Sequence, residues 1–129
     1  MLVNIEHYSK QMMKMTVKIF GIKNCDTMKK AFKFFEQHNI DFEFHDYKKQ
    51  GLSEALAQEF IAHIPLEKLV NKRGTTWRKL DDAIKDRLST DNAAALMIEN
   101  TSVIKRPIVL NKGQYLVGFN LGDYEKEFC

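Results

Sequence analysis

The chain has 129 residues, of which 44% are apolar and 29% are charged, and both values are ordinary for a globular protein. This length favours a single domain with one hydrophobic core. Lys and Arg number 20 against 17 Asp and Glu, giving a net charge of +3, which is too small and too dispersed to indicate direct nucleic-acid binding. No apolar run approaches the ~20 residues of a membrane helix. We therefore expect a cytoplasmic monomer with no membrane partner.

The first fourteen residues precede any recognisable strand pattern and include several methionines. We expect residues 1–14 to form an extension without a function, either frayed or foreign to the natural protein, with Met15 as the alternative start. Residues 15–129 are then expected to form one domain.

The first folded segment has the pattern of a βαβ unit. Residues 16–20 (TVKIF) are β-branched and apolar and predict a buried strand. Met28, Ala31, Phe32 and Phe35 follow the spacing of a helix that ends near residue 39. Residues 41–47 (DFEFHDY) alternate in polarity and predict a second strand. Such a unit is expected to be parallel and right-handed.

The middle of the chain is predicted to be helical. One helix follows Ser53 and is stopped by Pro65, which can open a short second helix through residue 70. Further helices are expected over residues 77–88 and 91–100. Because no Pro, Gly or Ser linker separates this part, we interpret residues 51–102 as a helical insertion rather than a second domain.

The C-terminal part has the pattern of a hairpin followed by a helix. Residues 106–110 and 114–119 predict strands around a short loop, residues 111–113, which contains Gly113. A closing helix is expected over residues 123–128. The sequence therefore predicts an α/β fold whose core comprises residues 15–50 and 103–129.

A solitary cysteine, Cys25, lies where the first strand ends and the first helix begins. An ordinary thiol, with a pKa of about 8.5, is only ~3% thiolate at pH 7. A helix N-terminus stabilises a negative charge by about 2 kcal/mol at most, so an activated thiol here would also need a nearby cation, for which Lys23 and Arg106 are candidates. The alternative is that Cys25 is a small buried hydrophobe.

Other features of the sequence have simpler interpretations. Metal binding is disfavoured because no Cys or His lies at ligand spacing from Cys25. Cys129, the last residue, is expected to be a frayed free thiol, and a resolving role would require the tail to fold back over Cys25. The basic residues of NKRGTTWRKL, residues 71–80, are most simply a solvated loop around Trp77.

Several motifs together closely resemble the arsenate reductase (ArsC)/Spx family, in particular its YffB-like branch. They are KIFGIKNCDTMKKA, FHDY, NKRGTTWRKL, AALM, IKRPIVL and VGF, in this order. The resemblance implies a bacterial protein with a thioredoxin-like fold and an inserted helical subdomain. It also implies that Cys25 is the nucleophile, that Arg106 is the arginine before the active-site proline, and that Pro107 is that proline, with a cis peptide bond that exposes backbone groups to a thiol peptide such as glutathione.

Two departures from the family pattern bear on the substrate. Arsenate reductases of this family hold the oxyanion with three arginines, whereas Asn71 and Gly118 stand at two of those positions, with Arg73 near the first. Spx-type regulators often have Cys-x-x-Cys, but this chain reads CDTM, which leaves Cys25 without a local disulfide partner.

The resemblance therefore implies a glutathione-dependent monothiol reductase with Cys25 and Arg106 as catalytic residues and no tightly bound cofactor. Glutathione would be the co-substrate, bound by Lys23, Asn24, Thr27, Arg73 and Pro107. Two alternatives stay open. One is an Spx-like module that binds RNA polymerase, since residues 117–120 (VGFN) resemble a VGYN-like sequence of that branch, and the other is an arsenate reductase.

Overall fold

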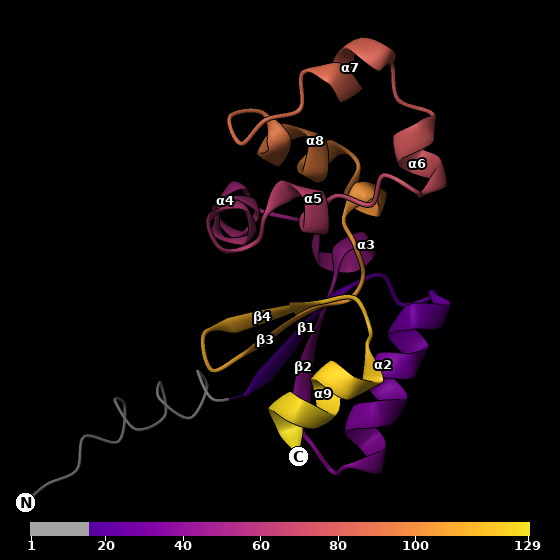
Figure 1. The fold of residues 1–129 in the computed structure, drawn as a ribbon, viewed down its shortest axis with the longest axis vertical. Helices are drawn as coiled ribbons and strands as arrows, with labels where there is room; N and C mark the ends of the chain where they lie inside the picture. The colour runs from indigo at the N-terminus through magenta and orange to yellow at the C-terminus, as the bar shows by residue number, and fades with distance from the viewer. Residues whose placement is uncertain (1–15) are drawn as a thin grey trace, which may run out of the picture.

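The computed structural model describes residues 16–129, so the prediction for the N-terminal extension lies outside the described residues. The described chain forms a four-stranded sheet in the order β2-β1-β3-β4 (Figure 1). Its strands are β1 (Val17–Gly21), β2 (Phe42–Asp46), β3 (Ile108–Asn111) and β4 (Gln114–Val117). β1 pairs in parallel with β2 and antiparallel with β3, and β3 pairs antiparallel with β4. The predicted α/β class and the parallel βαβ unit are confirmed.

Two helices cover one face of the sheet (Figure 1). α2 (Asp26–Gln37) and α9 (Leu121–Phe128) enclose an apolar cluster with the inward side chains of β1 and β3. Phe35 in this cluster is fully buried and packs edge-on against Phe128 of α9. The helical spacing of Met28, Ala31 and Phe35 therefore reflects this face of α2.

The helical part of the chain runs from the end of β2 to the start of β3. Its elements are α3 (Tyr47–Gln50), α4 (Glu54–His63), α5 (Leu66–Leu69), α6 (Thr75–Arg78), α7 (Asp82–Asp86), α8 (Ala93–Glu99) and the 3-10 helix η1 (Thr101–Val103). They build a second core that includes Phe20 and Ile108 from the other face of the sheet, so this part packs directly on the strands. Among residues 16–129, no helix is long and apolar enough to cross a membrane.

The prediction of one helix over residues 77–88 is wrong. Asp81 is extended, with φ −61° and ψ 143°, and separates α6 from α7. Trp77 is buried, whereas Ile84 is 43% exposed, so the two segments do not share a buried face. Short helices depend on tertiary packing for stability, and here the packing is not continuous.

Several boundaries differ from the predictions by a few residues. Tyr47 begins α3 instead of ending a strand, and β3 begins after Pro107. β4 stops at Val117, because Gly118 has a φ of 78°, which favours glycine. α8 is shorter than expected at both ends, and α9 begins two residues early, at Leu121.

The predicted hairpin is confirmed, with a tighter turn. Asn111 pairs with Gln114, which leaves only Lys112 and Gly113 in the loop. Their φ values are 51° and 80°, as a two-residue type I′ turn requires. Asn111 is buried, and its Nδ2 donates a hydrogen bond to Glu127 Oε1 at 3.0 Å, which ties the hairpin to α9.

Candidate functional site

Cys25 is the N-cap residue of α2, where β1 has ended and the chain turns into the helix. Its backbone is extended, with φ −144° and ψ 131°, and its carbonyl accepts a hydrogen bond from Lys29 N–H at 3.0 Å. The approach of α2 to β1 is close, because a Cβ added to Gly21 would lie 2.8 Å from Met28 Cε. This packing places the half-buried thiol above the carboxyl end of β1, an edge where ligands bind in open α/β sheets.

The pKa of the Cys25 thiol is lowered from its ordinary value. Burial of the sulfur is the largest single influence and acts the other way, raising the pKa. It is outweighed by the backbone N–H groups of Met28 and Thr27 together with the hydrogen bond and charge of Arg106. No capping hydrogen bond of ordinary geometry joins the Cys25 side chain to α2, so we attribute the effect of these N–H groups to their partial positive charge at the helix N-terminus.

Arg106 reaches the thiol from the segment that precedes β3. The Arg106–Pro107 peptide bond is cis, as the family resemblance implied. The half-buried guanidinium donates a hydrogen bond through Nη1 to Ser102 O at 3.2 Å, which orients it. The pairing of β1 with β3 ends at Phe20 and Ile108, so the backbone of Arg106 lies just beyond the ladder.

A long-range backbone pairing brings the helical part to this site. Val70 and Ile104 form an isolated antiparallel bridge. Asn71 N–H donates to Val103 O at 2.7 Å, and Lys105 N–H donates to Leu69 O at 2.8 Å. These two bonds hold the residue after α5 beside the segment that contains Arg106.

The residues so assembled enclose a cavity of about 390 Å³, here called the thiol cavity. Its lining is formed by Cys25, Thr27, Asn71, Lys105, Arg106, Val117, Gly118 and Phe119. Gly118 leaves this wall open, since a Cβ added there would meet nothing within 4 Å. The thiol cavity thus combines one nucleophile of lowered pKa with two cationic side chains, an arrangement suited to an anionic thiol or disulfide.

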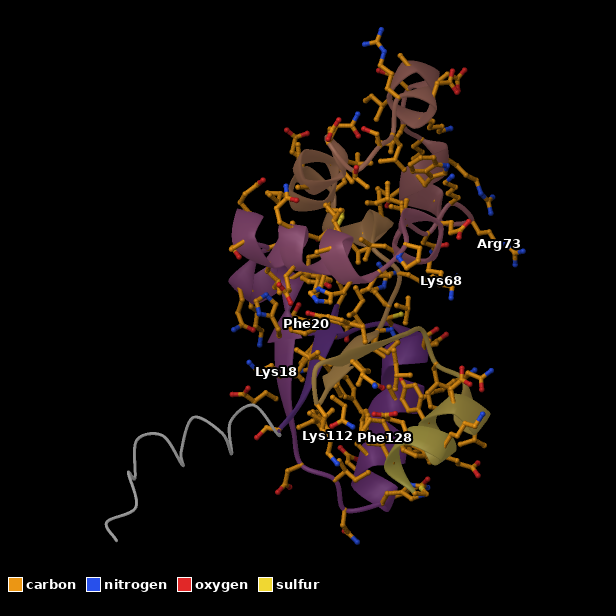
Figure 2. The ribbon with its side chains drawn as sticks, turned by 60° about the vertical axis from the view of Figure 1, so that its left-hand side comes forward. Lys18, Phe20, Lys68, Arg73, Lys112 and Phe128 are labelled. Atoms are coloured by element: carbon orange, nitrogen blue, oxygen red, sulfur yellow. The ribbon has the colours of Figure 1, made fainter. Side chains whose placement is uncertain are left out.

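The structure brings together some of the predicted site residues and not others. Cys25, Thr27 and Arg106 line the thiol cavity, whereas Lys23 and Asn24 are exposed in the loop before α2. Arg73 is exposed as well, and Figure 2 shows its side chain pointing outward from the helical part. The cation beside the thiol is therefore Arg106.

Two other predicted residues lie apart from the lining of the thiol cavity. Pro107 is buried next to it, and its carbonyl accepts a hydrogen bond from Gly118 N–H at 2.8 Å. Cys129 is exposed at the C-terminus, and Figure 1 shows this terminus near the end of α2 that is remote from Cys25. The two thiols are therefore not neighbours in this structure.

Sequence reasoning did not place Lys105, Val117 and Phe119 at the site of Cys25, although the last two belong to the VGFN sequence, and all three line the thiol cavity. Lys105 could have been suspected because it directly precedes Arg106, although neighbouring side chains in an extended segment normally point to opposite sides. Phe119 follows Gly118, whose positive φ turns the chain, so strand alternation could not place it.

Comparisons with known proteins agree with this architecture. The model of the ArsC family matches residues 20–127. An uncharacterized protein of Haemophilus influenzae is 43% identical over 113 residues, which is 88% of this chain and 99% of that protein. The solved structure of a YffB protein is 38% identical, with a TM-score of 0.84 over 88% of this chain and 100% of its own, and confirms the thioredoxin-like fold.

A more distant similarity links the chain to transcriptional regulators. The global transcriptional regulator Spx of Streptococcus agalactiae is 27% identical over 106 residues, which is 81% of this chain and 77% of the regulator.

Proposed function

Because this chain belongs to the ArsC family, we propose that it is a glutathione-dependent monothiol reductase with Cys25 as its nucleophile. The family includes thiol-based reductases, which supports an oxidoreductase activity in general. The observation that carries the proposal is the lowered pKa of the Cys25 thiol beside Arg106 in the thiol cavity. A thiolate at that position is the nucleophilic form of cysteine.

The proposed reaction is a pair of thiol–disulfide exchanges. The Cys25 thiolate attacks the glutathione sulfur of a mixed disulfide between a substrate thiol and glutathione. A new bond joins Cys25 to glutathione, the old disulfide breaks, and the substrate leaves as a thiolate that takes a proton from water. A second glutathione thiolate then attacks the glutathione sulfur held on Cys25, which releases glutathione disulfide and restores the Cys25 thiolate.

Cys129, the other cysteine of the chain, lies far from this site, which supports resolution by a second glutathione. The substrate thiol is the reduced product, and glutathione disulfide is the oxidised one.

The cationic side chains of the thiol cavity would bind the carboxylates of glutathione. Arg106 can form a paired hydrogen bond with a carboxylate, and Lys105 can act as a point charge. Thr27, which also lines the thiol cavity, would contact the tripeptide there. Lys23, Asn24 and Arg73 are exposed and lie outside the lining of the thiol cavity, so they would contribute only to parts of a ligand that extend outward.

The decisive experiment measures the pKa of Cys25 and its activity together. The rate of alkylation is followed against pH by mass spectrometry in a Cys129→Ser background, with and without Arg106→Ala. We expect the pKa to lie below that of a free cysteine and to rise when Arg106 is lost. An ordinary pKa that the substitution leaves unchanged would contradict the proposed role of Arg106.

The activity itself is tested with a glutathionylated thiol and glutathione reductase as the coupling enzyme. Consumption of NADPH should cease in Cys25→Ser and persist in Cys129→Ser. Full activity in the Cys25→Ser variant would refute the proposal.

A second candidate function is a docking module for RNA polymerase. The observation that favours it is the similarity to an Spx regulator over most of the chain, together with the VGFN sequence that partly lines the thiol cavity. A pull-down with purified RNA polymerase tests it, and retention of the polymerase by both wild type and Cys25→Ser would support docking independent of the thiol.

Arsenate reduction ranks third. Asn71 and Gly118, at two of the three positions where family arsenate reductases hold the oxyanion with arginine, both line the thiol cavity and bring no charge to it. Arsenate-dependent NADPH consumption in a coupled glutathione and glutaredoxin assay is the test, and we expect no activity above background.

A further inference from the structure

A shallow groove between α2 and α9 adjoins the thiol cavity. It has a volume of about 270 Å³ and is lined in part by Lys30, Lys33 and Phe34 of α2, with Phe119 and Leu121 on the side of α9. Phe119 lines both hollows, so the groove begins where the thiol cavity ends. We call this feature the α2–α9 groove.

The α2–α9 groove presents apolar surface that the described part of the fold leaves open. Leu121, the first residue of α9, is 53% exposed, the largest exposed fraction among the large apolar side chains of residues 16–129 that are exposed. Phe119 is only partly buried and packs edge-on against Tyr124, with 4.8 Å between ring centroids. Phe34 forms the buried base of the groove, and the His38 ring stacks on it.

The charge of this surface distinguishes it, like the thiol cavity, from three other hollows of the described chain. Of five cavities of about 270 to 390 Å³ on residues 16–129, three include at least one Asp or Glu in their lining. The thiol cavity and the α2–α9 groove have none, yet each has two cationic residues, Lys105 and Arg106 in the first and Lys30 and Lys33 in the second. Neither groove lysine is in an ion pair with another residue of the described chain.

We propose that the α2–α9 groove binds an acidic, partly apolar segment of a protein substrate whose cysteine sulfur enters the thiol cavity. The proposal rests on the proposed thiol chemistry and adds the class of substrate. Carboxylates of the segment pair with Lys30 and Lys33, and its apolar side chains cover Phe119 and Leu121. Gly118, beside which a side chain would meet nothing within 4 Å, lines the thiol cavity next to Phe119, the residue that the two hollows share.

The spacing of the lysines sets the position of the acidic residues. α2 rises about 1.5 Å per residue, so Lys30 and Lys33 lie roughly 7 Å and 12 Å along the helix from Cys25. An extended peptide rises about 3.3 Å per residue. The acidic residues should therefore stand about two and four positions away from the substrate cysteine.

The test compares two fluorescent peptides that have alanine in place of the cysteine. One has glutamates about two and four positions to either side of that alanine with leucines between them, and the other has lysines in place of the glutamates. Binding is measured by fluorescence anisotropy for the wild type, for Lys30→Glu/Lys33→Glu, and for the control Lys48→Glu/Lys49→Glu. The control changes the net charge equally through exposed lysines outside both hollows.

We expect the wild type and the control to bind the acidic peptide more tightly than the basic one. In Lys30→Glu/Lys33→Glu, affinity for the acidic peptide should fall about tenfold, since each exposed attraction becomes a repulsion of similar size. Equal binding of both peptides by the wild type, or an equal loss in the control, would overturn the proposal.

This experiment is separable from the proposed reaction, because the peptides have no thiol. A variant with Cys25→Ser should bind the acidic peptide like the wild type while it transfers no glutathione. Charge-selective binding without any thiol transfer would refute the reductase and leave the docking surface in place. Thiol transfer without charge-selective binding would support the reductase and refute the docking surface.

Discussion

Gly21→Ala should destabilise the protein through one contact. A Cβ at Gly21 would overlap Met28 Sδ and lie 2.8 Å from Met28 Cε, well inside the carbon contact distance of about 3.5–4.0 Å. Met28 is fully buried, so its flexible thioether can move only by displacing neighbours in the packed cluster. Overpacking of this kind costs typically 1–3 kcal/mol, and the flexibility of methionine favours the lower half, about 1–2 kcal/mol.

The assay is urea unfolding followed by circular dichroism, in a double-mutant cycle with Met28→Ala. Met28→Ala alone should cost about 2–5 kcal/mol, because it leaves a cavity. Adding Gly21→Ala to that variant should cost little more, because the clashing atoms are gone, so the coupling between the two sites should be about 1–2 kcal/mol. As a control, Gly122→Ala in α9 places its Cβ near Asn120 and not near Met28, so whatever its own effect on stability, its coupling with Met28→Ala should be less than about 0.5 kcal/mol.

The reasoning is refuted if Gly21→Ala destabilises the protein equally in both backgrounds. Met28 would then have no part in the effect, and the close approach of β1 to α2 would not be what requires glycine at the end of the strand.

Three other predictions follow from individual contacts. Tyr124→Phe removes the hydrogen bond that the buried hydroxyl donates to Gly118 O at 2.9 Å, and thermal unfolding should show a loss of about 1 kcal/mol. Lys112 has a φ of 51°, so Lys112→Asn should stabilise the hairpin by about 0.5 kcal/mol in the same assay; a loss of stability would count against the type I′ turn. Burial, with Glu59 as the second cause, raises the pKa of Tyr115 to about 12. The folded chain therefore holds this proton more tightly than the unfolded chain does, so stability should fall as the pH rises from about 10 through 12. Glu59→Gln should lower the pKa in an ultraviolet titration, and an unchanged value would contradict the assignment.

The elements that the sequence predicted well are those with a local signal. Alternating polarity and β-branched residues predicted the positions of β1 and β2, and the spacing of Met28, Ala31 and Phe35 predicted the position of α2. The position of Cys25 at the N-terminus of α2 follows from those two signals alone, because the residue lies between them. The hairpin was predictable from Gly113, although the pairing of Asn111 with Gln114 was not.

The features that could not be predicted from the sequence depend on contacts between residues that are distant in the chain. The spacing of Trp77 and Ile84 is compatible with one helix or with two. Only the packing of the helical part shows that Trp77 is buried and Ile84 is exposed. Asn71 and Lys105 line the same cavity as Cys25 because of the isolated bridge between Val70 and Ile104. A bridge of one residue pair leaves no periodic pattern in the sequence. The cis bond before Pro107 followed from the family resemblance, since trans is the common form of X-Pro bonds.

The bridge between Val70 and Ile104 also separates the segment with α6, α7 and α8, whose length can change, from the segment with Arg106, whose position has to be kept. The chain leaves for α6, α7 and α8 at Asn71 and returns at Val103, and a backbone hydrogen bond of 2.7 Å joins these two residues at the neck of the loop. Closing a longer loop costs little additional entropy, about 0.6 kcal/mol for each doubling of its length. Insertions or deletions at the tip around α7 can therefore accumulate while both ends of the neck, and with them Arg106 over the thiol, stay in register.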